Sequence, residues 1–77
     1  MATSDELMEG LCRKLRFLRI QSGMTQEVFC EVAGISLSRV RTIETDKAAN
    51  ISIRTLVKIA DGLSCDLVIG LKQRVGG

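Results

Sequence analysis

The stretch QEVFCEVAGISLSRVRTI, Gln26–Ile43, decides the fold of this chain. It contains two segments with helical periodicity, each about eight residues long, and Gly34 with one further residue separates the first from the cap of the second. Helices joined so tightly must cross steeply, so only small groups fit where they approach. Cys30 is such a small residue, Gly34 permits a left-handed backbone at the turn, and Val40 is an apolar wedge between the helices. This spacing predicts two short helices fixed at a sharp angle.

Helical periodicity predicts one helix before this stretch and another after it. The earlier helix begins near Ser4 or Asp5, either of which can cap it, and Gly23 stops it. The later helix is capped by Ser52 and follows a loop over residues 45–51. The apolar residues expected to face the core are Leu7, Leu11, Leu15, Leu18, Val28, Phe29, Val32, Val40, Ile43, Ile53, Leu56, Ile59, Ala60 and Leu63.

The C-terminal segment has a different pattern, because four β-forming residues stand close together in it: Leu67, Val68, Ile69 and Leu71. We therefore expect a mainly α fold, a bundle of four to five helices with a short C-terminal β-strand. The chain would divide into an N-terminal tail (1–5), one helical domain (6–64) and a C-terminal strand or tail (65–77).

A lone strand leaves its backbone N–H and C=O groups unpaired. We therefore expect this strand to pair with the same strand of a second copy, through Leu67, Ile69 and Leu71, and Phe17 and Ile20 could join that surface. The alternative is that the tail folds back over its own domain.

Length and composition exclude several classes of protein. Seventy-seven residues suffice for one domain. No apolar run approaches the roughly 18 residues that a membrane span needs, and the start MATSDELMEG lacks the pattern of a secretory signal, which predicts a cytoplasmic protein. Three cysteines without C-x-x-C spacing, and no histidine, predict free thiols and no metal site.

The formal charge of +2 is too small to indicate a nucleic-acid partner by itself. Its distribution is more informative, because basic residues concentrate in 11–20 and 36–58, with an acidic excess in 1–10 and 21–35. The basic segments could form one positive face after folding, or could belong to a solvated surface of mixed sign. No histidine, no activated nucleophile and no phosphate-binding glycine loop are present, so we expect neither an enzyme nor a cofactor.

The run RIQSGMTQEVFCEVAGISLSRVRTIE, residues 19–44, resembles the Xre-type helix-turn-helix proteins, the group that contains the lambdoid phage repressor and Cro domains. The later run TLVKIADGL matches the fourth-helix motif of that family, and the resemblance covers residues 7–64. Cys30 replaces the usual alanine, Asp46 stands where glycine is common, and no proline precedes the fourth helix. The resemblance implies a repressor-like bundle that binds double-stranded DNA as a homodimer.

In this family the third helix lies in the major groove and the second crosses the phosphate backbone. Arg41 could donate two hydrogen bonds to a guanine or could instead contact a phosphate, and Leu37 could contact a thymine methyl or form a local hydrophobic cap. The resemblance places Leu37, Ser38 and Thr42 at bases, and Arg41 lies beside them on the same outer side of the helix. The resemblance places Gln26 at a phosphate. Thr25 and Ser36 are expected first of all to cap the second and third helices, and they could contact phosphate as well. Arg39 and Lys47 would add positive charge around the groove, or could instead be solvated surface residues.

The resemblance also implies an ion pair between Arg19 and Glu44 that orients the third helix, a structural role rather than a DNA contact. The implied function is a transcriptional repressor that occupies an operator. The alternative is the antitoxin of a toxin–antitoxin pair, which would bind a toxin protein as well as DNA. A protein-interaction module on the same scaffold is a third possibility, and it predicts no salt-sensitive binding to DNA.

Overall fold

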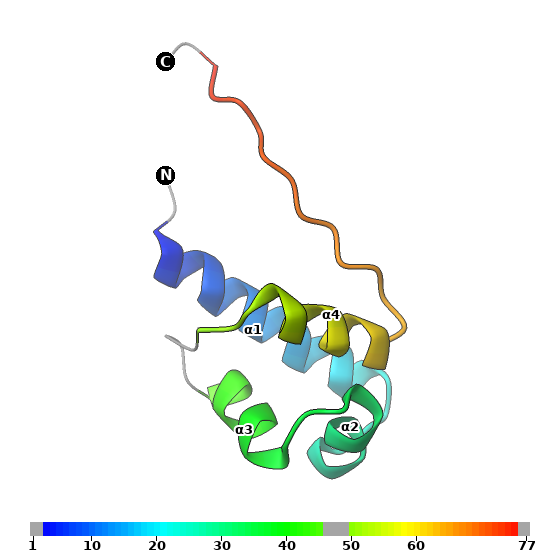
Figure 1. Ribbon diagram of the computed structural model, residues 1–77. Coiled ribbons are helices and arrows are strands. Elements are labelled where there is room, and N and C mark those ends of the chain that lie inside the picture. The colour runs from blue at the N-terminus through cyan, green and yellow to red at the C-terminus, as the bar shows by residue number, and fades with distance from the viewer. Residues whose placement is uncertain (1–2, 46–49, 76–77) are drawn as a thin grey trace.

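The computed structural model describes residues 3–45 and 50–75. Within these ranges it contains four helices, α1 (Ser4–Gln21), α2 (Gln26–Ala33), α3 (Leu37–Thr45) and α4 (Ile53–Gly62). α2 packs against both α3 and α4, and α3 packs against α1, while the C-terminal tail leaves the bundle (Figure 1). The expected mainly helical class is confirmed. Four to five helices were expected, and the described part of the chain contains four.

The three expected caps of the later helices are confirmed. Thr25, Ser36 and Ser52 each accept, through the side-chain oxygen, the backbone N–H of the residue three positions later, at 3.0 to 3.2 Å. Each bond satisfies one of the N–H groups that the first turn of a helix leaves without a backbone partner. These local bonds fix where α2, α3 and α4 begin.

The first helix begins one residue earlier than expected. Thr3, rather than Ser4 or Asp5, is its cap, and the Thr3 hydroxyl accepts the N–H of Glu6 at 3.2 Å. Asp5 and Glu6 consequently both lie in the first turn, where the positive end of the helix dipole favours carboxylates. Ser4 and Asp5 therefore belong to α1 and not to a preceding tail.

The turn between α2 and α3 has the predicted geometry. Gly34 has φ +72°, in the left-handed region, and its N–H donates to the carbonyl of Cys30 at 3.0 Å. The N–H of Ile35 donates to the same carbonyl at 3.1 Å. Gly23, after α1, also has a positive φ of +75°. A residue with a Cβ adopts this conformation at a cost, so both glycines end their helices.

The core is aliphatic apart from one aromatic ring. The leucines of α1 cover it from one side, where Leu11, Leu15 and Leu18 are partly buried. The buried apolar residues are Cys12, Phe29, Ala33, Val40, Ile43, Ile51, Leu56, Ile59, Ala60 and Leu63. Val40 and Ile43 thus hold the inner side of α3 as predicted.

The prediction for the buried face of α2 is partly wrong. Phe29 and Ala33 are buried, but Val28 and Val32 are exposed. An eight-residue helix that packs against both α3 and α4 buries the one arc that faces both neighbours. Leu7 and Ile53 are also exposed, contrary to expectation, because each lies in the first turn of its helix, at an end of the bundle.

A close approach of two helices lies between α2 and α4. A Cβ added at Gly62 would lie 3.1 Å from the Cβ of Ala33 and 3.1 Å from Cε1 of Phe29. Cys30, which the sequence placed at the crossing of α2 and α3, is only partly buried, and its thiol donates to the carbonyl of Glu27 at 3.0 Å. Gly62 therefore allows the close approach of α4 to α2, and a Cβ at this position would need its neighbours to shift by a few tenths of an ångström.

The expected C-terminal strand is not formed within the described residues. The chain from Cys65 to Val75 has no regular secondary structure and runs as an extended tail away from the helices (Figure 1). Leu67 packs against the core, whereas Val68, Ile69, Leu71 and Val75 are exposed. A strand exists only where a second strand accepts and donates its backbone hydrogen bonds, and a single copy supplies no such neighbour here.

Candidate nucleic-acid interface

The outer side of α3 is open to solvent. Val40 and Ile43, at 2% and 3% exposure, fix the opposite side of the helix in the core. Of the four candidate base-reading residues, Ser38 and Arg41 are exposed, and Leu37 and Thr42 are partly exposed. None of the four is buried by the described part of the chain, so the outer side of α3 is accessible and carries both polar and apolar groups.

The hydroxyls of this surface are already engaged in local bonds. Thr42 Oγ1 donates to the carbonyl of Ser38 at 3.0 Å, so it retains lone pairs with which to accept a further bond. Ser36 and Thr25 use their oxygens as cap acceptors, which leaves the hydroxyl proton of each available. These two capping side chains can donate to an anion at the N-termini of α3 and α2.

Arg41 has a partner that the sequence did not suggest. Its Nη2 lies 3.6 Å from Oε1 of Glu27, in the first turn of α2. The two residues are fourteen positions apart and on different helices, so no helical spacing could have indicated the pair.

Two of the residues predicted at phosphates bond to the protein itself. Arg39 Nη2 donates to the backbone carbonyl of Asn50 at 2.7 Å, which ties α3 to the segment before α4. Gln26 Nε2 donates to Oε1 of Glu44 at 3.2 Å. Lys47 lies outside the described residues. The structure thus gives Arg39 and Gln26 a role in the fold beside the predicted one.

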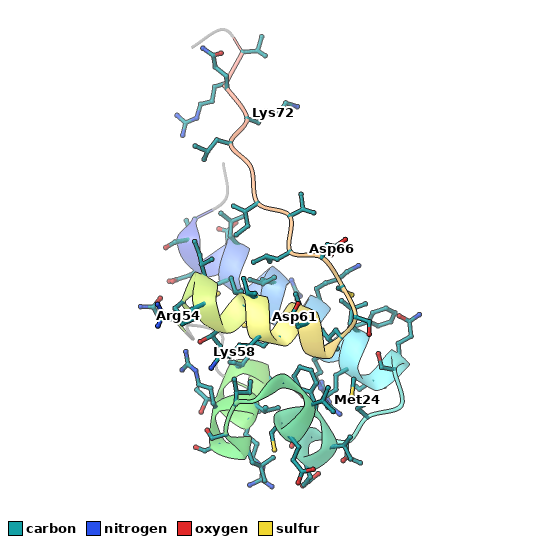
Figure 2. All side chains as sticks on the ribbon, turned by 45° about the vertical axis from the view of Figure 1, so that its right-hand side comes forward. Met24, Arg54, Lys58, Asp61, Asp66 and Lys72 are labelled. Carbon is teal, nitrogen blue, oxygen red and sulfur yellow. The ribbon has the colours of Figure 1, made fainter. Side chains whose placement is uncertain are left out.

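The Arg19–Glu44 pair is present and well buried. Arg19 Nε donates to Glu44 Oε2 at 2.6 Å and Arg19 Nη2 donates to Oε1 at 2.8 Å, and only 4% of the Glu44 side chain is exposed. Arg19 Nη1 also donates to the carbonyl of Met24 at 2.8 Å. Met24 belongs to the turn before α2, and Figure 2 labels it. The hydrogen bonds that Arg19 donates to Glu44 raise the pKa of Arg19, burial opposes them, and the charge of Glu44 raises the pKa further, so the guanidinium stays charged. One side chain thereby joins α1, the following turn and the end of α3.

Arg16 is a basic residue at this surface that sequence reasoning missed. Its side chain is largely exposed, its Nε lies 3.8 Å from Glu44 Oε1, and it lines a hollow with Thr25 and Gln26 at the N-terminus of α2. Arg16 precedes Arg19 by three positions, which places both on one side of α1, and this spacing could have indicated it. The hollow brings a cation, an amide and a hydroxyl to the end of a helix that attracts anions, together with the carboxylates of Glu27 and Glu44.

The three residues predicted for a dimer contact are not brought together in a packed site. Leu67 is partly buried against the helices, Ile69 is exposed, and Leu71 is fully exposed on the tail. Phe17 and Ile20 are exposed on α1, with more than half of each residue's surface accessible.

Comparison with known proteins agrees with this geometry. A family model described as "Helix-turn-helix" matches residues 15–69, which extend from the second half of α1 into the tail. No curated protein and no solved structure matches the chain. None of the helices in the described ranges is long and apolar enough to span a membrane.

Proposed function

Because the chain belongs to the helix-turn-helix family of Xre- and lambda repressor-like DNA-binding domains, and is therefore a DNA-binding regulator of transcription, we propose that it is a sequence-specific dimeric repressor. The observation that carries the proposal is the asymmetry of α3, buried through Val40 and Ile43 and open through Ser38 and Arg41. A helix anchored on one side and free on the other can enter the major groove, which admits a single α-helix.

Base reading is assigned to the open side of α3. Arg41 donates to O6 and N7 of a guanine, a pairing that discriminates against other bases by about 1–3 kcal/mol. Leu37 contacts a thymine methyl, and Ser38 and Thr42, which can donate or accept, discriminate less. The preferred half-site therefore contains at least one essential G·C pair.

Phosphate contacts fix the orientation of the protein on the duplex without reading sequence. We assign them to the N-terminus of α2, with Thr25, Gln26 and the exposed Arg16, and to Ser36 at the start of α3. Arg39 adds positive charge at α3, and Lys47 is proposed as a further phosphate contact from the sequence alone. The Gln26 amide nitrogen carries two N–H donors, so it can keep its bond to Glu44 and donate the second N–H to a phosphate.

A single α3 reads only a few base pairs, so the proposed repressor is a dimer whose two reading helices lie one DNA turn, about 34 Å, apart. Ile69 and Leu71 on the extended tail are exposed apolar side chains that a second copy would cover. Pairing of two tails would also supply the missing strand partner. The protein would act in the cytoplasm, without catalysis, metal or cofactor.

Selection of bound duplexes from a random library, followed by titration of two variants, tests the proposal. Arg41→Ala should weaken binding to the selected duplex and relax the preference at one base pair, because one bidentate contact is lost. Gln26→Ala should weaken binding to all duplexes by a similar factor. Failure of the native protein to enrich any sequence, or an unchanged preference in Arg41→Ala, would contradict the proposal.

The second candidate function is an antitoxin that represses its own operon. The exposed apolar residues of the tail, including Val68 and Val75, favour it because they offer a surface to a protein of another kind. Co-purification of a second small protein encoded beside this chain would support the antitoxin. A chain that purifies alone and still selects a DNA sequence supports the simple repressor.

A further inference from the structure

We propose that Glu27 is a selectivity residue, whose carboxylate holds the guanidinium of Arg41 and favours its contact with a guanine over its contact with a phosphate. The inference rests on the proposed DNA-binding function. It adds a residue that the resemblance did not assign to any role, and it decides between the two contacts that the sequence left open for Arg41.

The geometry of the pair is that of a surface contact that contributes little to the fold. The distance from Arg41 Nη2 to Glu27 Oε1 is 3.6 Å, and 57% and 63% of the two side chains are exposed. An ion pair so exposed contributes little to folding. The Arg19–Glu44 pair, at 2.6 Å and nearly buried, is the structural one. Glu27 and Arg41 therefore meet on the surface without being required by the fold.

The position of Glu27 would be unfavourable for DNA binding if its charge were not compensated. It is the second residue of α2, next to Gln26, and it lines the same hollow as Arg16 and Thr25, where we place a phosphate. A carboxylate repels an approaching phosphate, and at short range this repulsion is only partly screened by salt. Arg41 is the cation that neutralises it.

Selectivity follows from the different charges of the two targets of Arg41. A guanidinium has five N–H donors in one plane, so Arg41 can keep Glu27 on one edge and still donate to O6 and N7 of guanine from another. The guanine edge is neutral and is not repelled by Glu27. A phosphate that reaches the same guanidinium is anionic and meets the carboxylate as well. Glu27 therefore weakens the non-specific contact more than the specific one.

The test compares Glu27→Gln with the native protein on two duplexes, the one selected from the random library and a scrambled duplex of the same length and composition. Glutamine keeps the size of the side chain and removes its charge. We expect the dissociation constant for the scrambled duplex, divided by that for the selected duplex, to fall about two- to fivefold. This range corresponds to the free energy of an exposed ion pair. Binding to the scrambled duplex should tighten, and its dependence on salt should steepen by about one phosphate contact.

Glu31→Gln is the matched control, because Glu31 is an exposed carboxylate on the same helix and its substitution changes the net charge equally. Both duplexes should then respond by the same factor, which leaves the ratio unchanged. In an Arg41→Ala background, Glu27→Gln should no longer lower the ratio, because Glu27 acts through Arg41. Thermal unfolding of each variant verifies that the fold is intact.

Three results would overturn the inference. The first is an unchanged or larger ratio in Glu27→Gln, and the second is an equal fall of the ratio in the Arg41→Ala background. The third is an equal fall in Glu31→Gln, which would assign the effect to net charge. If the native protein prefers no duplex, the proposed function fails and this inference fails with it. A preserved preference with an unchanged ratio overturns only the role of Glu27.

Discussion

Burial separates the Arg19–Glu44 and Arg41–Glu27 ion pairs into different kinds. Arg19 and Glu44 are held by two short hydrogen bonds with almost no solvent access, whereas Arg41 and Glu27 are loosely paired in water. Water and salt screen the second pair, so its partners can separate at small cost. Loss of one partner from the first pair leaves a charge that neither water nor another ion can stabilise fully.

Arg19→Ala should consequently lower the free energy of unfolding by about 3–5 kcal/mol, because Glu44 then keeps its charge with only Gln26 and the distant Arg16 beside it. Urea unfolding followed by circular dichroism measures this. Arg16→Ala, which removes an exposed cation 3.8 Å from the same carboxylate, should cost less than about 1 kcal/mol. If both variants lost the same free energy of unfolding, burial would not explain the difference between the two arginine contacts.

Two glycines should respond oppositely to the same substitution. Gly34→Ala should destabilise the protein by about 1–2 kcal/mol, because the residue has φ +72° although a Cβ there would meet no other atom within 4 Å. Gly10→Ala, in the interior of α1 with equally free surroundings, should stabilise by about 0.5–1 kcal/mol. Urea midpoints of both variants provide the comparison, and a stabilised Gly34→Ala would contradict the assigned turn.

At the scale of the elements, α2 decides how the helices pack. It is short, it contacts both α3 and α4, and Ala33 and Gly62 allow α4 to approach it closely. Its apolar residues occupy a wider arc than α3 and α4 can cover, and Val28 and Val32 therefore remain exposed to solvent. The packing of this short helix therefore contributes to the orientation of α3 and of its outer surface.

Gly62→Ala should therefore be destabilising by about 1–3 kcal/mol, although alanine favours a helix, because the new methyl group would press on Ala33 and Phe29 at 3.1 Å. Unfolding in urea gives the magnitude. In an Ala33→Gly background the cost of Gly62→Ala should be smaller, since one of the crowded methyl groups is gone. An identical cost in both backgrounds would exclude this contact as the cause.

At the scale of the whole molecule, the tail sets the shape. The molecule measures 46 × 23 × 22 Å, and Figure 2 shows Lys72 far from the helices while Asp66 lies where the tail leaves them. Ile69 and Leu71 are exposed along this extension. Exposed apolar groups on an extended segment favour association, in which strand pairing and burial would occur together.

The combined variant Ile69→Lys, Leu71→Lys should be monomeric at concentrations where the native protein is a dimer, as measured by sedimentation equilibrium. It should bind a duplex with two half-sites more weakly and a single half-site as before, and its helix content should not change because both side chains are exposed. Gln73→Lys, which adds a charge to the same tail without removing an apolar group, serves as the control. A native protein that is monomeric at every concentration would remove the tail from the proposed mechanism.

Local features of this fold were predictable from the sequence. The caps at Thr25, Ser36 and Ser52, the left-handed turn at Gly34, and the inward residues Val40 and Ile43 all agree with the structure. Each depends on backbone groups within four residues or on the helical repeat. The same repeat placed the proposed base-reading residues outward, and the family resemblance supplied the Arg19–Glu44 pair.

Only the tertiary structure decided which arc of α2 is buried, that Glu27 meets Arg41, and that the tail has no strand partner within one copy. The buried arc and the ion pair depend on the position of helices distant in the sequence, and periodicity alone cannot tell two adjacent arcs of a short apolar helix apart. A strand depends on a neighbour that one copy of this tail does not supply, because its hydrogen bonds are made between chain segments and not within one.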